Sequence, residues 1–480
     1  MKKVRYRYLY KHLEEREMAS KKIACLGAGS LYFMSGIPDI ILADGLSGSE
    51  ICLYDIEREK ARLMADACRR IAVSIGADFK IKVASSLSEA VDSADFVVTS
   101  IGGSGADISS NVYSSYYHAV DMHISAKYGI HQIIGDTCGP AGMMMAFRSI
   151  PVYMEVCKEM EKRCPKAVLF NHSNPMAVLC RAMRKYSCIH TIGICHGVQA
   201  GILYAAKLLD VKPEELECTW VGTNHYYWFT SVFHKKEDMY PVLRERLIHT
   251  EKQEGRILSA ELSRIYGYHI VYPSDDHIIE FYPFLTQFPS GQDLLPYGLA
   301  KSARAHGFDE RQSFPVREPK TEKTRQEFFK KYKEILSGIK VPEQRVNKIY
   351  GEAIGSIIES IALGHRDIYI LNIPNEGAIP NLPSHSIVEI EAVTDSRGVR
   401  PVVMGGAPPV LRGILEKRFV WQELVVDAGV KGDRNLALQA LMVDEMAIIP
   451  EKAEKMLDEL LVASKELLPQ FFKKAGKIIL

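Results

Sequence analysis

Six short apolar runs, separated by segments of helical character, occupy the first 200 residues of the chain. Helix-like stretches such as Ser88–Ser93 and Ala141–Arg163 lie between them. The runs are Lys21–Ser30, Glu50–Asp55, Lys80–Val83, Asp95–Ile101, Lys166–Asn171 and Cys188–Ile194. Buried strands joined by helical crossovers predict an α/β fold with a doubly wound parallel sheet in the order 3-2-1-4-5-6. Ligands of such sheets bind outside the carboxyl ends of the strands.

The turn after the first run carries two glycines, Gly27 and Gly29, followed by Ser30. Gly27 allows a tight turn, and Gly29 lets the backbone approach a pyrophosphate at the start of the next helix. Asp55 lies 26 residues past Gly29, near the spacing at which a carboxylate binds ribose hydroxyls and disfavours a 2′-phosphate. Tyr32 stands where the third glycine of G-x-G-x-x-G would be. The pattern predicts a Rossmann-like NAD site formed by Gly27, Gly29, Ser30 and Asp55.

A second group of reactive side chains follows the sixth run. Cys195 and His196 come just past its end, and the apolar run Trp220–Thr223 leads to His225, 30 residues after the cysteine. A thiolate and an imidazole on neighbouring loops would hold a metal ion and leave positions open for substrate oxygens. Structural zinc sites instead close four ligands in tight pairs. The alternative is a buried small cysteine and a histidine with ordinary polar partners.

The composition excludes several classes of function. The chain of 480 residues has 60 basic and 59 acidic residues, so its net charge indicates no general attraction to polyanions or membrane surfaces. The ten cysteines are dispersed without a C-x-x-C pair, which is typical of reduced thiols. No apolar stretch approaches the ~20 residues needed to span a bilayer. The basic N-terminus lacks the apolar core of a secretory signal. We expect a cytoplasmic protein.

Beyond residue 200 the pattern becomes a mixture of helices and strands. We expect an N-terminal extension at residues 1–20, the Rossmann-like domain at 21–200, and an α+β domain for substrate, metal and oligomerisation at 201–480. The segments predicted within the last domain are helical Asp238–Gly267, peripheral Ala300–Lys333, strand-like Tyr369–Gly377 and helical Asn435–Phe472.

A set of ordered motifs extends over about residues 20–450 of the chain. The motifs are Gly27-Ala-Gly-Ser30, Gly135-Asp-Thr-Cys-Gly-Pro140, Asn171-His-Ser-Asn-Pro175, Cys195-His-Gly197, Gly222-Thr-Asn-His225, Asn372-Ile-Pro-Asn-Glu-Gly377 and Asn381-Leu-Pro383. Together they resemble glycoside hydrolase family 4, the NAD- and Mn²⁺-dependent glycosidases related to malate and lactate dehydrogenases.

The resemblance implies that Cys195 and His225 are metal ligands. It also implies that Asn174 contacts the sugar hydroxyls or the nicotinamide side of the site, although an asparagine before Pro175 is equally typical of a turn. The implied reaction departs from the two-carboxylate mechanism of most glycosidases. It consists of transient oxidation at C3 of the sugar with NAD⁺, removal of the C2 proton beside a divalent metal, and departure of the aglycone from C1.

The base that removes the C2 proton has three candidates after the metal histidine. Tyr272, Asp276 and His277 all lie in that region, and the phosphoglycoside-cleaving members of the family use a tyrosine there. We favour Asp276 as the base, with Tyr272 as the alternative and His277 as a substrate-binding residue. His196 is a candidate to assist departure of the leaving group, because imidazole titrates near neutrality. Each of these residues is also compatible with an ordinary polar loop.

The residue after the metal cysteine indicates the substrate. The members of this family that cleave phosphorylated sugars have Cys-Asp or Cys-Asn at this point and carry an arginine after the fourth strand. This chain has His196-Gly197 there and Gly102-Gly103-Ser104 in place of the arginine. These departures argue against a 6-phosphoglycoside, and Cys-His-Gly most resembles the α-glucuronidase and α-galacturonidase branch. Neutral α-galactosides or α-glucosides are the next expectation.

Two other classes of function share the predicted sheet. One is an NAD-dependent 2-hydroxyacid dehydrogenase, which would not need the pair Cys195 and His225; the other is a nucleotide-responsive regulatory protein without catalysis. Nucleic-acid binding has no support, because no basic stripe with interleaved aromatics is present. We expect a carbohydrate substrate, no nucleic-acid or membrane partner, and assembly as a homodimer or homotetramer.

Overall fold

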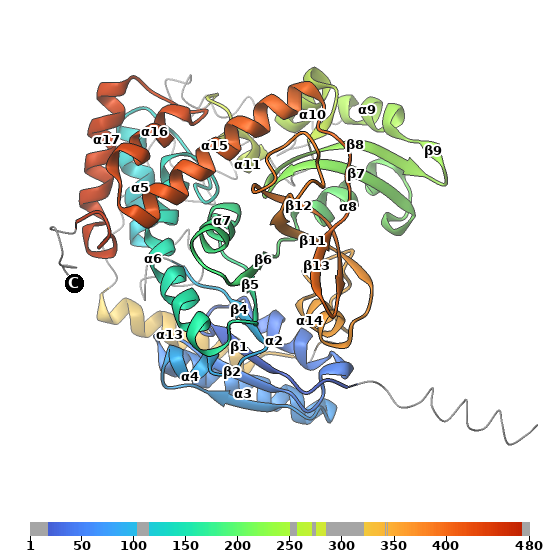
Figure 1. Ribbon diagram of the computed structural model, residues 1–480, viewed down its shortest axis with the longest axis vertical. Coiled ribbons are helices and arrows are strands. Elements are labelled where there is room, and N and C mark those ends of the chain that lie inside the picture. The colour runs from blue at the N-terminus through green and yellow to red at the C-terminus, as the bar shows by residue number, and fades with distance from the viewer. Residues whose placement is uncertain are drawn as a thin grey trace, which may run out of the picture.

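The largest sheet of the protein has nine strands (Figure 1), in the order β13-β12-β11-β6-β5-β4-β1-β2-β3. The computed structural model describes residues 18–102, 115–249, 257–270, 275–284, 321–340, 342 and 344–472. The first six strands are β1 Lys22–Leu26, β2 Glu50–Tyr54, β3 Lys80–Val83, β4 Phe96–Thr99, β5 Val168–Asn171 and β6 His190–Gly193. They are parallel and follow the order 3-2-1-4-5-6, so the predicted doubly wound sheet is confirmed.

Alternate residues of β1 face opposite sides of this sheet. Ile23 and Cys25 belong to one apolar core, whereas Ala24 and Leu26 belong to another. This two-residue period is that of a strand. Because helices cover both faces, the strand reads in the sequence as a continuous apolar run. The helices that follow the first six strands are α2 Phe33–Ile41, α3 Arg58–Ile75, α4 Leu87–Val91, α5 Tyr116–Lys127, α6 Gly139–Arg163, α7 Met176–Tyr186 and α8 Gly197–Leu209.

Three strands from the second half of the chain complete the same sheet. They are β11 Asp367–Pro374, β12 Ile387–Asp395 and β13 Gly398–Pro401, and Asn372 of β11 pairs antiparallel with Gly193 of β6. The sequence predicted the strand in β11 but not its position beside β6. As a result, residues far apart in the chain meet at the carboxyl end of β6.

A second, antiparallel sheet carries the histidine predicted to bind metal. It consists of β7 Leu216–Thr223, β8 Tyr226–His234 and β10 His269–Ile270, with β9 Glu237–Asp238 paired to β8. Thr223 Oγ1 donates a hydrogen bond of 2.9 Å to the carbonyl of Ile387 in β12, which fixes the end of β7 against the large sheet. The helices around this sheet are α9 Tyr240–His249, α10 Ile257–Tyr266 and α11 Asp275–Ile278.

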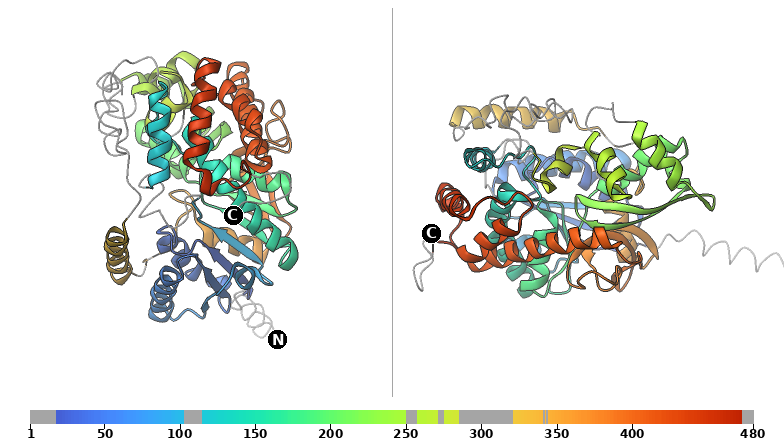
Figure 2. Two further views of the ribbon diagram at one scale, coloured as in Figure 1. Left: turned by 90° about the vertical axis from the view of Figure 1, so that its left-hand side faces the viewer. Right: turned by 90° about the horizontal axis from the view of Figure 1, so that it is seen from above.

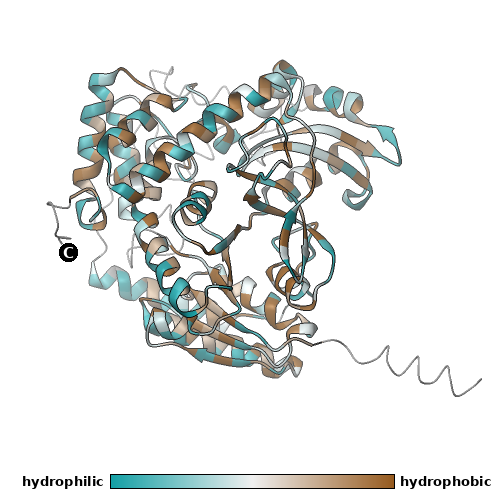
Figure 3. Ribbon diagram, in the orientation of Figure 1, coloured by the Kyte–Doolittle hydropathy of each residue, from teal (hydrophilic) through white to brown (hydrophobic). Residues whose placement is uncertain are grey.

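The remaining helices enclose the two sheets. They are α13 Glu322–Ser337, α14 Ile354–Leu363, α15 Pro409–Lys431, α16 Arg434–Val443 and α17 Pro450–Ala463, with short 3-10 helices η1 Asp44–Leu46, η4 Pro213–Glu215, η5 Ile279–Phe281 and η8 Lys465–Leu467. Helix α13, tan in Figure 2, lies at the edge of the molecule, where Arg70 of α3 donates to the carbonyl of Leu336 at 3.1 Å. Figure 3 shows α15 and α17 banded in both colours, as expected for helices with one buried side.

Several predicted segments can be compared with these bounds. Helices α9 and α10 lie within the predicted helical stretch 238–267; α17 lies within the predicted helical tail, and α16 begins one residue before it. The N-terminal arm up to residue 17 and residues 300–320 of the predicted peripheral segment lie outside the described residues. No helix within the described ranges combines the length and the apolar character required to cross a membrane. The division of the chain into domains at residue 200 stays a prediction.

Candidate active site and metal centre

The glycine turn after β1 is held in the conformation that the sequence predicts. Gly27 has a φ of +75°, and a Cβ at this position would lie 2.2 Å from the carbonyl oxygen of Ser100. The amide of Gly29 donates to Asp55 Oδ2 at 2.8 Å, and Ser30 Oγ is 2.9 Å from Ser100 Oγ. The four residues expected to contact NAD therefore lie together at the carboxyl edge of the sheet.

The residues predicted to bind metal also come together. Cys195 follows β6, and His225 is at the tip of the two-residue turn between β7 and β8. Cys195 Sγ is 3.6 Å from His225 Nε2, and both residues are buried. His225 adopts the left-handed region with a φ of +62°, a conformation that is costly for a residue with a Cβ and is enriched at functional sites.

A chain of hydrogen bonds determines which nitrogen of His225 faces the cysteine. Thr137 Oγ1 donates to Asp136 Oδ1 at 2.6 Å, which uses its single proton. Thr137 Oγ1 also lies 2.9 Å from His225 Nδ1, and because its own proton is used it must accept from that nitrogen. His225 therefore carries its proton on Nδ1 and presents the lone pair of Nε2 to Cys195. This is the arrangement in which a partner of the second nitrogen orients a metal-binding histidine.

The thiol and imidazole fit a single metal ion. For Zn²⁺, bonds of about 2.3 Å to sulfur and about 2.1 Å to nitrogen that meet at a tetrahedral angle span about 3.6 Å. Burial raises the pKa of the Cys195 thiol well above its usual value, and the charges of Glu389 and Glu352 add to this effect. Burial lowers the pKa of His225 to about 3. His225 is thus ready to bind metal, whereas Cys195 must lose a proton first.

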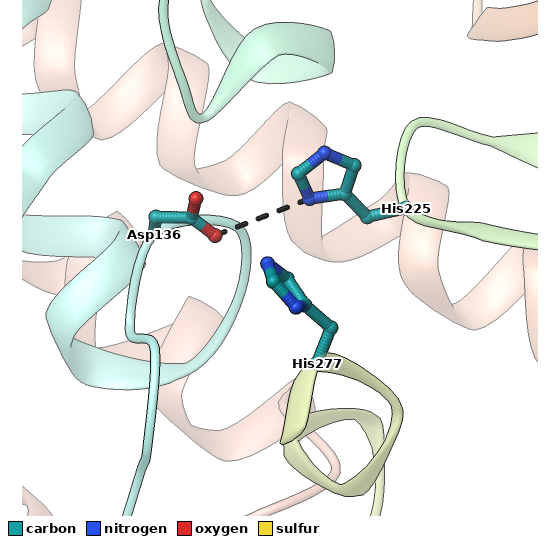
Figure 4. Close-up of side chains that lie close together, drawn as sticks. All are labelled: Asp136, His225 and His277. Carbon is teal, nitrogen blue, oxygen red and sulfur yellow. Dashed lines mark ion pairs between the residues drawn. The ribbon is translucent and has the colours of Figure 1, made fainter. Parts of the chain in front are cut away.

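A further cluster lies on the other side of His225. Single ligand atoms of Asp136, His225 and His277 lie within 4.8 Å of one another (Figure 4). The rings of His225 and His277 meet edge to face with centroids 5.1 Å apart. Oxygen donors such as Asp136 extend the set of groups that can surround a hard cation such as Mn²⁺. Asp136 therefore adds an oxygen donor on the Nδ1 side of His225, whereas Cys195 lies on the Nε2 side.

Asp276 and His277, expected separately as base and substrate-binding residue, form one hydrogen-bonded pair. Asp276 Oδ1 lies 3.2 Å from His277 Nδ1 and accepts from the His277 amide at 3.0 Å. Burial opposes a charge on His277, but its hydrogen bond to Asp276 and the nearby charges of Asp136, Asp276 and Glu280 raise its pKa overall. The third candidate, Tyr272, lies outside the described residues.

Asn174 reaches this cluster from the loop after β5. Its Nδ2 donates to Asp136 Oδ2 at 2.8 Å, so the two oxygens of Asp136 are bonded by Thr137 and Asn174 respectively. Glu280 holds the loop of Asp136 in place, because its Oε1 accepts from the amides of Ile134 at 2.6 Å and Gly135 at 3.1 Å. The amide of Asn174 thus orients the Asp136 carboxylate, and its contact with the sugar or the nicotinamide stays a prediction.

His196 follows Cys195, and its side chain is 64% exposed. Its Nδ1 is 3.2 Å from Glu352 Oε1, and this hydrogen bond raises the pKa of His196. Glu352 also accepts from His172 Nδ1 at 3.0 Å through its other oxygen. Despite burial, these two histidines lower the pKa of Glu352 to about 2.

Four functional side chains were not identified as such from the sequence: Asp136, Thr137, Glu280 and Glu352. The first two lie inside the motif Gly135-Asp-Thr-Cys-Gly-Pro140, which carried the resemblance, so a signal for them was present. Glu280 lies in the acidic and aromatic stretch that contains Asp276 and His277 but was given no role there, and Glu352 belongs to no motif that was singled out. Their partners are 145 and 156 residues away in the chain, so only the fold brings them together.

Comparison with known proteins decides the family. The model of family 4 glycosyl hydrolases matches residues 22–211, and that of the family's C-terminal domain matches residues 220–447. The chain belongs to glycoside hydrolase family 4. This family 4 protein is thus a glycosidase, as the motifs predicted, and the dehydrogenase and regulatory-protein alternatives do not hold.

The relatives of this family 4 enzyme act on different sugars. An α-galactosidase from Bacillus subtilis is 28% identical, covering 94% of this chain and 100% of the relative. An α-galacturonidase from Thermoanaerobacter italicus is also 28% identical, covering 93% of this chain and 97% of the relative. A 6-phospho-α-glucosidase from gut microorganisms, solved in complex with NAD and Mn²⁺, has a TM-score of 0.73 at 19% identity over 94% of this chain and 99% of that one. That likeness shows a shared fold.

Proposed function

We propose that this family 4 enzyme hydrolyses α-uronides, with NAD⁺ and a divalent metal such as Mn²⁺ as cofactors. The observation that carries the proposal is the approach of Cys195 Sγ to His225 Nε2, 3.6 Å apart, at the carboxyl edge that also holds the glycine turn. Cys195 and His225 would hold the metal through Sγ and Nε2, and Gly27, Gly29, Ser30 and Asp55 would hold NAD⁺. The 6-phospho-α-glucosidase solved with NAD and Mn²⁺ supports the choice of these two cofactors.

When bound, NAD⁺ supplies an acceptor and later a donor of hydride at C3, and the metal supplies positive charge where negative charge develops on the sugar oxygens. The protein must then provide a base for the C2 proton. The pair Asp276 and His277 suits this role. Asp276 holds the His277 ring in place through its Nδ1, and the His277 ring lies close to His225 and Asp136. Asn174 orients the carboxylate of Asp136 through a hydrogen bond.

His196 would assist departure of the aglycone. As the C1–O bond breaks, its electron pair passes to the aglycone oxygen, which takes the proton of His196 Nε2. The water that then adds to C1 gives a proton back to His196, so the residue ends the cycle as it began. The exposed side chain of His196 supports this role. Its hydrogen bond to Glu352 raises the pKa of His196, which also supports it.

The choice of an α-uronide is supported by the sequence Cys195-His-Gly197, which resembles the α-glucuronidase and α-galacturonidase branch. The α-galacturonidase from Thermoanaerobacter italicus is consistent with it. Neutral α-galactosides are the second candidate, because the α-galactosidase from Bacillus subtilis is equally similar.

A panel of p-nitrophenyl α-glycosides tests the proposal. With NAD⁺, Mn²⁺ and a reductant present, we expect the galacturonide or glucuronide to give the highest kcat/KM, ahead of the galactoside, the glucoside and a 6-phosphoglucoside. Removal of the metal with EDTA should abolish turnover, and added Mn²⁺ should restore it. A neutral or phosphorylated sugar as the best substrate would overturn the assignment of uronides, and full turnover without NAD⁺ would overturn the cofactor assignment.

A further inference from the structure

A chain of hydrogen bonds connects the cofactor turn to the residue after the metal cysteine. Tyr32 Oη lies 2.8 Å from His172 Nε2, His172 Nδ1 lies 3.0 Å from Glu352 Oε2, and Glu352 Oε1 lies 3.2 Å from His196 Nδ1. The rings of Tyr32 and His172 also stack with centroids 4.0 Å apart. The four residues come from four separate segments, so the chain ties these segments to one another.

The direction of each bond follows from the groups involved. The Glu352 carboxylate has only acceptors, so His172 and His196 must each donate from Nδ1. A neutral His172 then accepts at Nε2, and Tyr32 donates its phenol proton. For His196 the result is that Nδ1 is occupied and Nε2 is the nitrogen left to meet a substrate. The same logic explains Tyr32 at the place of the third glycine, since a glycine could not make this bond.

The segment that presents Glu352 is itself firmly held. The buried carboxylate of Asp39, in the helix after the glycine turn, accepts from the amides of Val346 at 2.8 Å and Gly355 at 2.7 Å. Ala353, next to Glu352, adopts the left-handed region with a φ of +44°. Non-glycine residues keep this conformation where the surrounding structure enforces it, which occurs most often at functional sites. The helix that approaches the cofactor therefore also sets the position of Glu352.

We propose that Glu352 is a positioning residue, which fixes the His196 ring relative to the cofactor turn so that Nε2 faces the glycosidic oxygen. Glu352 does not touch the sugar in this account and acts through His196. The inference rests on the proposed role of His196 at the leaving group. It follows that loss of Glu352 impairs departure of the aglycone but spares hydride transfer and removal of the C2 proton, because neither of these steps involves the aglycone oxygen.

The variant Glu352→Gln tests this separation of steps. The variant replaces one of the two carboxylate oxygens by an NH₂ group, which only donates, so the bond to one of the two histidines is lost. Two readouts are needed: kcat/KM for α-glycosides whose aglycones range from nitrophenols to methanol, and exchange of the C2 hydrogen of the free product sugar in D₂O, followed by NMR. Free sugar has no aglycone to expel, so its exchange reports only oxidation and deprotonation.

We expect Glu352→Gln to lose on the order of 100-fold in kcat/KM for the methyl glycoside, the scale of a general-acid contribution, and far less for dinitrophenyl glycosides that leave without assistance. Exchange at C2 and NAD⁺ affinity should stay near wild type. Glu214→Gln is the matched control, because Glu214 accepts from Tyr350 of the same segment at 2.7 Å on its exposed side. This control should keep wild-type values in both readouts.

An equal loss for all aglycones together with lost exchange would show that Glu352 merely maintains the fold, and the proposal would be wrong. Unchanged values for every aglycone would also refute it. Failure of the underlying function looks different: wild-type enzyme would then show no exchange at C2, whatever the behaviour of the Glu352 variant.

Discussion

Cys195 and His225 face each other across 3.6 Å, although one follows a strand of the large sheet and the other lies at the tip of a hairpin in the second sheet. The distance depends on the packing of β7 against β12, where Thr223 bonds the carbonyl of Ile387. The proposed metal centre therefore depends on the contact between the two sheets. Substitutions at this contact and at the ligands should separate metal binding from binding of the dinucleotide.

Substitution of Cys195 by Ser should abolish metal-dependent turnover and leave NAD⁺ affinity within about twofold of wild type. The thiolate is a metal ligand in this account, whereas NAD⁺ binds on the loop after β1. Binding of Mn²⁺ by electron paramagnetic resonance and of NAD⁺ by calorimetry measures the two effects. Cys188→Ser, at an exposed cysteine, is the control and should change neither. Near-normal activity of Cys195→Ser with Mn²⁺ would remove Cys195 from the metal site.

Thr137→Val should weaken Mn²⁺ binding by about 10- to 100-fold, the usual effect of losing the partner that orients a metal-binding histidine. Without the hydroxyl, His225 Nδ1 and Asp136 Oδ1 both lose a hydrogen bond. Thr137→Ser keeps the hydroxyl and should keep most of the affinity. If the valine and serine variants bind Mn²⁺ equally well, the proton position assigned to His225 is wrong.

Asp55 should make the enzyme prefer NAD⁺ to NADP⁺. Its carboxylate accepts from the amides of Gly29 at 2.8 Å and Glu57 at 2.7 Å, and this places a negative charge where a 2′-phosphate would lie. Asp55→Asn keeps the shape and an acceptor but removes the charge. It should therefore reduce the ratio of the Kd for NADP⁺ to the Kd for NAD⁺ by about tenfold. Equal dissociation constants for NAD⁺ and NADP⁺ in the wild type, measured by calorimetry, would contradict this role.

Glu280 should make the stability of the protein depend on pH. Burial raises its pKa to about 7 from 4.5, even though the amides of Gly135 and Ile134 oppose the shift. A carboxyl whose pKa is raised on folding favours the folded state below its unfolded pKa, and this contribution is lost as pH rises through 7. Glu280→Gln has no carboxyl to ionise and should not lose this contribution. Its denaturant midpoint should therefore rise relative to that of the wild type as pH increases from 5 to 8. A constant difference between the two midpoints would contradict the shifted pKa.

The sequence predicted the large sheet well because its signals are local. The alternation of apolar runs and helical segments, with two glycines after β1, predicted six strands and their order. The positions of Cys195 and Asn174 at the carboxyl edge could be predicted for the same reason, since each follows an apolar run. His225 ends another such run, and the roles of all three residues stay predictions.

Other parts of the site depend on contacts between distant segments, which no local pattern encodes. Glu352 meets His196 only because β11 joins the large sheet beside β6 and α14 packs near α2. The pairing of Asp276 with His277 is a matter of side-chain orientation, so the sequence presented the two as separate candidates. Assembly as a homodimer or homotetramer stays a prediction.

The central claim is that hydrolysis proceeds through removal of the C2 proton beside the metal, and one measurement tests it most directly. Hydrolysis of an aryl α-uronide in D₂O, with NAD⁺ and Mn²⁺, should place deuterium at C2 of the released sugar, detected by NMR, without steady accumulation of NADH. A glycosidase that uses two carboxylates never breaks the C2–H bond. Product with only hydrogen at C2 after complete turnover in D₂O would contradict the account.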